Sequence, residues 1–412
     1  GTPAGIAAPQ VDIAPRTAGS VAVGTSDSPE PLSLAPDLLA SLSASLLRIG
    51  QAEFNGSVPT TAENIRFATA FSFPGALSLS GTGNVTQEAA ANLTIGSLAS
   101  LVDGRLTLTN PGNSIPVLFG NLARTGFALR TSGDLAIGFL QSPEVVLRAV
   151  NMTQGAANYI RGGTLSLQAT GSVDLRGANA VTSLLSSNVA GTLRLDNGGP
   201  LLTVPGGSLV QAGGGIEVNQ AGGLQMAGTL SASAGPVALV STGDMTVSGS
   251  VTGGGAVRLR AGGSIALQPG SSVASYATPS LVSVLAGYDA GTGTTNPANA
   301  GSLTLAGQLG DDSLTGAVEI GAGTGGILQT GGRVLTDNLT VISGGDARIN
   351  GATTSNQVSG LGTSSVAGAL LLNTNDQLST SGTVSAGSIG LTSSGDTTID
   401  GTLSATGEVF LR

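Results

Sequence analysis

One short sequence pattern occurs three times in succession in this chain: Gly215-Ile-Glu-Val218, Gly235-Pro-Val-Ala-Leu239 and Gly255-Ala-Val-Arg-Leu259. In each copy a glycine leads into apolar residues that alternate with other residues, as in a strand with one buried face. Ile216, Val237 and Val257 hold the same place in the pattern, at intervals of 21 and 20 residues. The repeat is therefore short and its length is nearly constant.

Two further strand patterns keep the same interval. One appears at Leu224/Met226, Met245/Val247 and Ile265/Leu267, and the other at Leu230 and Val251. Three brief strands in about 20 residues, without a helical period, predict an all-β fold, a parallel β-solenoid. Each coil of such a fold buries its inward side chains only when another coil stacks on it.

The alternation also predicts which side chains point inward. Arg258 and Arg260 alternate with the apolar positions and are expected to face solvent. The expected inward side chains, stacked in columns from coil to coil, are Val237, Leu239, Met245, Val247, Val257, Leu259, Ile265 and Leu267.

The composition fits a narrow, tightly wound core. Only 9% of the 412 residues are charged, against roughly 25% in an ordinary soluble domain, and 66 are glycine. Hydrophobic residues still make up 40% of the chain, and they recur periodically, which disordered chains rich in Gly and Ser do not show. The composition therefore favours a folded chain.

Several kinds of chemistry are excluded by missing residue types. The chain has no Cys, His or Trp, and all 15 of its basic residues are Arg. Thiolate and disulfide chemistry, a histidine base and a lysine Schiff base are thereby ruled out. A net charge of -9 with scattered arginines argues against nucleic-acid binding, and no apolar run is long enough to span a membrane.

Three regions are predicted along the chain. Residues 1–36 are rich in proline and are expected to be an arm or linker. Residues 37–74 are expected to hold a short helix and the first coils, which together cap the solenoid or provide an oligomerisation contact. Residues 75–412 carry the repeats, with a loop excursion near 271–301. Four phenylalanines are expected to cover the exposed core at the first coil: Phe54, Phe67, Phe71 and Phe73.

Both ends of the sequence suggest a larger context. Gly1 is not an initiator methionine, which favours a processed or truncated chain. The last strand, Val409/Leu411, continues the repeat without a polar cap. The expectation is that further coils of a longer polypeptide or another molecule cover this strand.

A smaller motif, Gly-Asp before a strand, recurs at Asp244, Asp346 and Asp396. An aspartate in this position can accept a hydrogen bond from a nearby backbone N–H and fix the turn. The alternative is a ladder of metal-binding aspartates, but no second acidic residue recurs at a fixed offset. Turn formation is therefore the favoured interpretation.

The repeats resemble those of filamentous haemagglutinin-like proteins, secreted adhesins of the two-partner-secretion or autotransporter type, most closely alphaproteobacterial ones. The resemblance covers roughly residues 45–412 and depends on short motifs. These are Leu46-Leu-Arg-Ile-Gly50, Gly83-Asn-Val-Thr-Gln87, Leu93-Thr-Ile-Gly-Ser-Leu98, Asn113-Ser-Ile115, Asn151-Met-Thr-Gln154, Gly326-Ile-Leu-Gln329 and Asn356-Gln-Val358.

The resemblance implies a right-handed parallel β-helix, export from a Gram-negative bacterium and a place at the outer cell surface or in an extracellular or biofilm matrix. It implies adhesion or filament formation as the function. The partners expected on this basis are other copies of the chain, further coils of a longer parent, and a host surface or extracellular polysaccharide. The amino-terminal secretion domain typical of the family is not part of this sequence.

Two other functions share this fold. A homopolymeric fibre subunit would stack head to tail through its open ends. A polysaccharide lyase or hydrolase would need clustered aspartates, for which Asp311-Asp312 and the Asp396/Asp400 pair are the best candidates. Consecutive residues in a strand point to opposite faces, and neither pair has a neighbouring base. The prediction is therefore a protein without catalysis, with no catalytic, cofactor-binding or metal-binding residues.

Overall fold

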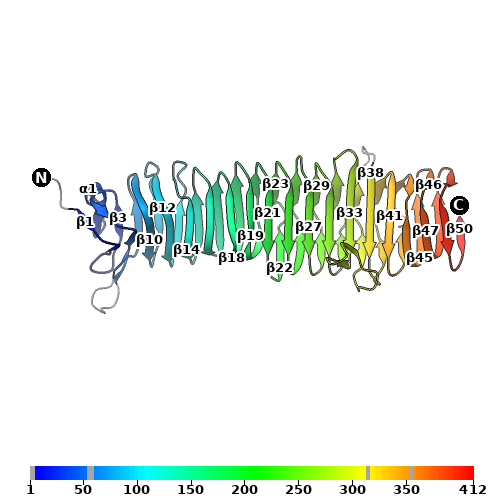
Figure 1. Ribbon diagram of the computed structural model, residues 1–412, viewed down its shortest axis with the longest axis horizontal. Coiled ribbons are helices and arrows are strands. Elements are labelled where there is room, and N and C mark those ends of the chain that lie inside the picture. Colours follow the sequence, from blue (N-terminus) through cyan, green and yellow to red (C-terminus); the bar gives the residue numbers. More distant parts are fainter. Residues whose placement is uncertain (1–4, 53–59, 312–315, 352–355) are drawn as a thin grey trace. The chain divides into compact units, whose positions relative to one another are not determined.

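The computed structural model describes residues 5–52, 60–311, 316–351 and 356–412, and its secondary structure consists almost entirely of short parallel strands joined by turns. The strands repeat about every 20 residues, and each pairs with its counterpart in the next coil. The chain divides into two compact units, residues 1–182 and 183–412. Each unit is a β-solenoid, and the predicted fold class is confirmed (Figure 1).

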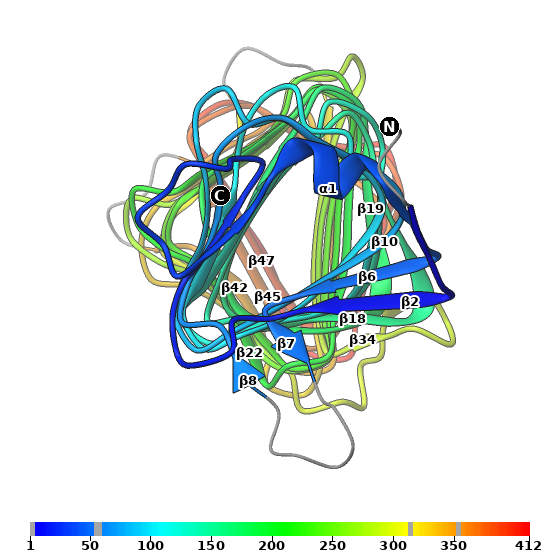
Figure 2. The ribbon, with the colours of Figure 1, turned by 90° about the vertical axis from the view of Figure 1, so that its left-hand side faces the viewer.

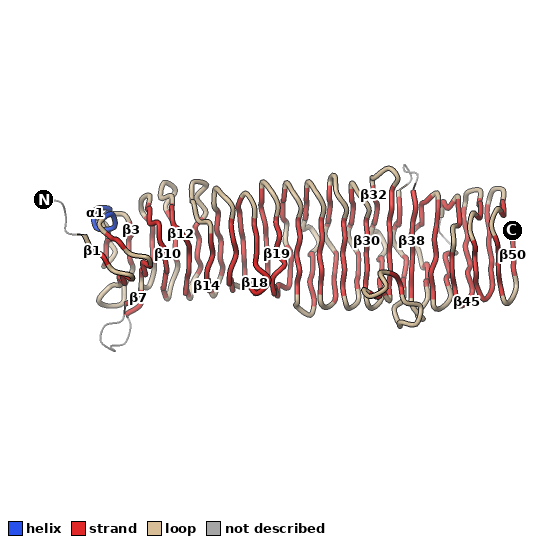
Figure 3. The backbone as a smooth tube through the Cα atoms, viewed as in Figure 1, coloured by secondary structure: helices blue, strands red, loops and turns tan. Residues whose placement is uncertain are grey.

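In unit 2, residues 183–412, each regular coil contributes one strand to each of three parallel stacks (Figure 3). The first stack contains β21 (Leu193–Asn197), β24 (Ile216–Gln220), β27 (Val237–Ser241), β30 (Val257–Ala261), β33 (Ser280–Ala286), β38 (Gly316–Ala322) and β41 (Asn338–Ser343). The second contains β22 (Leu201–Val204), β25 (Gly223–Met226), β28 (Met245–Val247), β31 (Ile265–Leu267), β36 (Leu303–Leu305), β39 (Ile327–Gln329) and β42 (Ala347–Ile349). The third contains β20 (Ser187–Val189), β23 (Leu209–Ala212), β26 (Thr229–Ala232), β29 (Ser250–Gly253), β32 (Ser272–Ser275), β37 (Gln308–Gly310), β40 (Arg333–Thr336) and β43 (Gln357–Val358).

The later coils of unit 2 use longer strands that bend across a corner. In β45, the register shifts between Val366 and Ala369 where the strand passes from one stack to the next. These coils contain β44 (Gly360–Leu361), β45 (Ser364–Thr374), β46 (Leu378–Thr380), β47 (Thr383–Ser393), β48 (Thr397–Ile399), β49 (Thr402–Ala405) and β50 (Val409–Leu411).

The eight side chains predicted to point inward are all buried. Val237 pairs with Val257 and Leu239 with Leu259, while Met245 pairs with Ile265 and Val247 with Leu267. The predicted columns are therefore confirmed, because in-register parallel pairing places each inward residue on its equivalent one coil later.

Unit 1, residues 1–182, is built from two main stacks of parallel strands. One contains β2 (Gln10–Ile13), β6 (Leu46–Ile49), β10 (Phe71–Gly81), β12 (Leu93–Val102), β14 (Val117–Ala123), β16 (Leu135–Gln141) and part of β18 (Met152–Ala169). The other contains β4 (Leu32–Leu34), β3 (Val21–Val23), β9 (Ile65–Phe67), β11 (Val85–Gln87), β13 (Arg105–Leu108), β15 (Gly126–Arg130), β17 (Glu144–Ala149) and the rest of β18. The remaining strands are β1 (Ile6–Ala7) with β5 (Leu42–Ser43), the antiparallel pair β7 (Gln51–Ala52) and β8 (Thr60–Thr61), and β19 (Val173–Leu184), which begins in unit 1 and ends in unit 2.

The prediction that residues 1–36 form a proline-rich arm or linker is wrong for residues 10–34. Strand β2 pairs with β6, and β3 pairs with β9, so both belong to the stack. Val21 and Val23 are fully buried. Pro15 lies between β2 and β3, and Pro29 and Pro31 lie between β3 and β4, so these prolines are outside the paired strands. Residues 1–4 lie outside the described part.

The predicted short helix is present. Helix α1 (Pro36–Ala40) begins with a proline in its first turn and buries Leu39. Figure 2 shows α1 in front of the coils of unit 1, at the N-terminal end of that unit. Phe67, Phe71 and Phe73 are core residues of the coils themselves, with stacked or tilted rings. They do not form an outer cover, because β2 and β3 add coil strands beyond them; Phe54 lies outside the described residues.

The loop excursion of unit 2 is narrower than predicted. Strands β32 and β33 lie within 271–301 but belong to the regular stacks. The true excursion follows β33 and contains a small antiparallel hairpin, β34 (Tyr288–Asp289) with β35 (Thr294–Thr295). Tyr288 covers Arg260, whose guanidinium carbon lies 4.8 Å from the ring centroid. Arg260 was expected to face solvent, but this hairpin makes it part-buried; Arg258 beside it is also half-buried.

Some corner glycines are required by the close approach of successive coils. A Cβ atom on Gly249 would overlap the carbonyl oxygen of Gly228 in the preceding coil. Any larger residue would push two coils apart at a point where their backbones are hydrogen-bonded on both sides.

Replacing Val257 with Asp tests the core register. Val257 is fully buried between Val237 and Val282, so the variant places a carboxylate in an apolar column. We expect a loss of stability on the order of several kcal/mol, seen as a lower melting temperature by circular dichroism. Arg258→Asp, one residue away on the outer face, is the matched control and should melt close to the wild type. Equal melting temperatures for wild type and Val257→Asp would contradict the assigned register.

Candidate functional site

Pairs of amide side chains, each with a buried asparagine, recur in the motifs that carry the family resemblance. Gln154 Nε2 donates to Asn179 Oδ1, and Asn179 Nδ2 donates back to Gln154 Oε1, both at 2.9 Å. Gln329 and Asn356 form the same reciprocal pair at 2.9 and 3.0 Å. Gln87 and Asn113 repeat it at 2.6 and 3.1 Å. The recurrent Gln and Asn of the sequence therefore meet across successive coils.

Each asparagine of these pairs also bonds to the backbone. Asn356 Oδ1 accepts from the N–H of Val334 at 2.9 Å, and its Nδ2 donates to the carbonyl of Asn373 at 3.0 Å. Asn356 is fully buried. Its amide thus satisfies backbone groups at a corner, where the strand ladder leaves them unpaired. The pairs stabilise the coil corners and are already saturated, so they offer no site for a ligand.

The Gly-Asp motif acts between coils, which corrects the predicted local turn bond. Asp244 Oδ1 accepts from the N–H of Ser264 at 2.7 Å, and Asp346 Oδ1 accepts from the N–H of Ala369 at 3.0 Å. Asn84 does the same toward Arg105 at 2.8 Å. The carboxylate or amide oxygen therefore anchors the start of the strand in the next coil. Asp396, the third member of the motif, is exposed.

The candidate acidic residues for catalysis do not come together. Asp396 and Asp400 flank β48 and are both exposed, and Ser379 Oγ donates to Asp400 at 3.4 Å. Asp311 is half-buried after β37, several coils before β48, and Asp312 lies outside the described residues. Across the described ranges, no three acidic residues are grouped as they would be to hold a metal ion.

The carboxylates with shifted pKa values are held in their charged form. In unit 1, Arg66 donates two hydrogen bonds to Glu30, at 2.7 and 3.0 Å, and lowers the pKa of that carboxyl. In unit 2, the N–H of Ala369 and then the guanidinium of Arg348 lower the pKa of Asp346. A general acid needs the opposite shift, toward neutrality.

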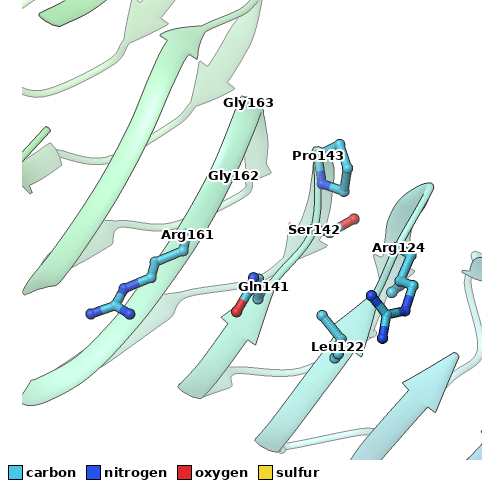
Figure 4. A pocket seen from close by; sticks show the side chains of 9 residues that line it. Leu122, Arg124, Gln141, Ser142, Pro143, Arg161, Gly162 and Gly163 are labelled. Atoms are coloured by element: carbon cyan, nitrogen blue, oxygen red, sulfur yellow. The ribbon is translucent and has the colours of Figure 1, made fainter. Parts of the chain in front are cut away.

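An open groove of about 460 Å³ lies on the outside of unit 1, across β14, β16 and β18. Leu122, Gln141 and Arg161 lie in register on these three strands and form one wall (Figure 4). Ser142, at the corner after β16, is buried, and its hydroxyl has no hydrogen-bond partner within the described chain. Arg124, also beside the groove, is paired with Asp103 at 2.6 Å.

Aromatic side chains stand beside this groove on the outer face. Phe139 of β16 and Tyr159 of β18 are register partners, with ring centroids 5.1 Å apart. The guanidinium of Arg161 lies 4.2 Å from the centre of the Tyr159 ring. Phe119 of β14 is 65% exposed. We call Phe119, Phe139, Tyr159 and Arg161 the aromatic strip.

Sequence reasoning missed the aromatic strip, although a signal was present. The aromatic residues stand at positions 119, 139 and 159, one coil length apart, at places that the inward alternation leaves outside. An analysis of the outward positions by coil length would have found them. A second open groove in unit 2 is lined by Ser271, Gln308 and Arg333, but Gln308 already accepts from this guanidinium at 3.0 Å.

Comparison with known proteins assigns no relative to this chain. No protein-family model, curated protein or solved structure matches it. The candidate site therefore has to be interpreted from its own geometry.

Replacing Asn356 with Ala tests the structural role of the amide pairs. The variant leaves the Gln329 amide and the Val334 N–H buried without a partner, which should cost about 1–3 kcal/mol. Asn338→Ala, at an exposed position of the same unit, is the matched control. Thermal unfolding compares the two; equal stability of both variants would show that the pair contributes nothing.

We predict that Asp346 makes a contribution to the stability of unit 2 that is lost in acid. Because its pKa is lowered on folding, its contribution is present above the unfolded value, about 3.9, and is lost as the pH falls through the folded value. Asp346→Asn should therefore be less stable than the wild type near neutrality, and the difference should shrink in acid. Melting curves across a pH series measure this, with the exposed Glu408→Gln as control. A difference that stays constant with pH would contradict the assignment.

Proposed function

We propose that this chain is part of a cell-surface or extracellular β-solenoid protein of a Gram-negative bacterium, that it acts in adhesion or filament formation, and that it has no catalytic activity. The observation that carries the proposal is the aromatic strip of unit 1. Its side chains are outside the core on a rigid stack of coils, where they are free to contact a partner.

The electrostatics of the described residues favour attachment over catalysis. Their shifted carboxylates, Glu30 and Asp346, are made more acidic by hydrogen bonds and ion pairs. The candidate acids Asp311 and Asp396 are in separate coils, after β37 and before β48. Hydrolysis or elimination on a polysaccharide would need a base and an acid on one substrate.

The described part of the chain contains no helix that is long and apolar enough to cross a membrane. The resemblance to filamentous haemagglutinin-like repeats supports an extracellular place, and it is the basis for that part of the proposal. No family model supports it independently.

Locating the protein in its producing bacterium tests this function. An antibody raised against the purified chain should label intact cells or the extracellular matrix, and protease added to intact cells should remove the signal. A cytoplasmic protein that survives the same protease treatment is the control. Soluble chain added in excess should also reduce attachment of the cells to a surface. Confinement of the protein to the cytoplasm would contradict the proposal.

A further inference from the structure

We propose that the aromatic strip of unit 1 binds an extended polysaccharide that carries uronate carboxylates. In this proposal Phe139 and Tyr159 stack on sugar rings, and Arg161 binds a carboxylate. The inference deepens the proposed function and rests on it, since the polysaccharide would be the material to which the protein attaches.

The exposure of the aromatic residues is the first reason. The chain has only eight Phe and three Tyr, and Phe67 and Phe127 show that a ring can be fully buried in this core. Phe119 and Phe139 are instead 65% and 37% exposed. Exposed aromatic surface without a core to complete is typical of a recognition surface.

The arrangement of the rings suits a sugar. Phe139 and Tyr159 are 5.1 Å apart and inclined by 53°, and together they form a ridge across two coils. A pyranose presents C–H groups on its faces, which pack against the electron-rich face of an aromatic ring. Phe119 lies one coil earlier, beside Gly138 of β16, and its exposed ring adds apolar surface to this face.

Arg161 supplies the preference for an acidic sugar. Its guanidinium lies against Tyr159, and among the described residues it makes no ion pair. The neighbouring arginines differ: Arg124 is paired with Asp103 at 2.6 Å and Arg105 with Glu144 at 2.9 Å. An arginine held by a ring, with its remaining donors available, is suited to binding a carboxylate.

The coil spacing fits a polymer. Gln141 and Arg161 are register partners on adjacent coils, separated by about 4.8 Å as paired strands are. A polysaccharide that lies along the stack meets a new set of side chains at each coil. The distance between coils is comparable to the length of one sugar unit in such a polymer. The open groove of about 460 Å³ beside the rings, with the partnerless Ser142 hydroxyl at its corner, gives room for sugar hydroxyl groups.

A single-stranded nucleic acid also stacks on aromatic side chains, but the charge opposes it. Nucleic-acid binding needs several cations along the backbone, whereas the strip offers one unpaired arginine on a chain with a net charge of -9. An acidic polysaccharide with contacts to rings and to one guanidinium fits the surface better.

Binding of polygalacturonate oligomers by the purified chain tests the proposal, with fully methyl-esterified oligomers of the same backbone as the neutral comparison. Isothermal titration calorimetry should give measurable binding of the acidic oligomer and weaker binding of the ester. Phe139→Ala combined with Tyr159→Ala should weaken binding of both by about tenfold or more. Arg161→Gln should remove the preference for the acidic form and leave binding of the ester unchanged.

Control variants keep the test specific. Leu328→Ala removes an exposed apolar side chain of unit 2, and Arg258→Gln removes an arginine of the same unit; both should bind like the wild type. Each strip variant should retain the melting temperature of the wild type, because its side chain is outside the core. A variant that is destabilised is replaced by Phe119→Ala, which is expected to weaken binding in the same direction.

Absence of binding by the wild-type chain, equal binding of acid and ester, or unchanged binding in the strip variants would each overturn the inference. None of these outcomes affects a surface location found with the antibody, so the proposed function would stand. Conversely, uronate binding by a protein confined to the cytoplasm would overturn the proposed function alone. New reducing or unsaturated ends in the oligomers would contradict the non-catalytic role while supporting the binding site.

Discussion

In-register parallel pairing between successive coils is the constraint on which the rest of the structure depends. Each strand hydrogen-bonds to its equivalent about 20 residues later, so inward side chains stack on inward side chains. A shift of one residue would exchange the buried and exposed faces of a strand. The chain therefore tolerates extra residues only at corners, as the hairpin β34–β35 demonstrates: the strands before and after it, β33 and β36, keep their register.

The same constraint explains the polar chemistry of the interior. At a corner the backbone turns away from the ladder, and its N–H and C=O groups need other partners. Amide side chains serve here because each carries both a donor and an acceptor, which allows Gln154 and Asn179 to bond reciprocally and to the backbone as well. A carboxylate can only accept hydrogen bonds. It occurs where one backbone N–H of the next coil needs an acceptor, as at Asp244.

The outer face is free of these requirements. Side chains at outward positions take no part in the packing of the core, so they can vary without loss of the fold. In unit 1 such outward positions hold Phe139, Tyr159 and Arg161, and in unit 2 they hold Arg260, which packs against Tyr288. The residues that stabilise the core are thus separate from those to which we assign the proposed binding.

The sequence by itself determined the β-solenoid, the coil length and the inward columns such as Val237 over Val257, because a period and an alternation are local properties. It did not reveal that residues 10–34 join the stack, since proline and glycine there obscure two short strands whose pairing is with distant residues. Only the tertiary structure brought Gln329 to Asn356 and Tyr159 to Phe139. Each of these contacts joins residues about one coil apart, and whether they meet depends on the register at every corner between them.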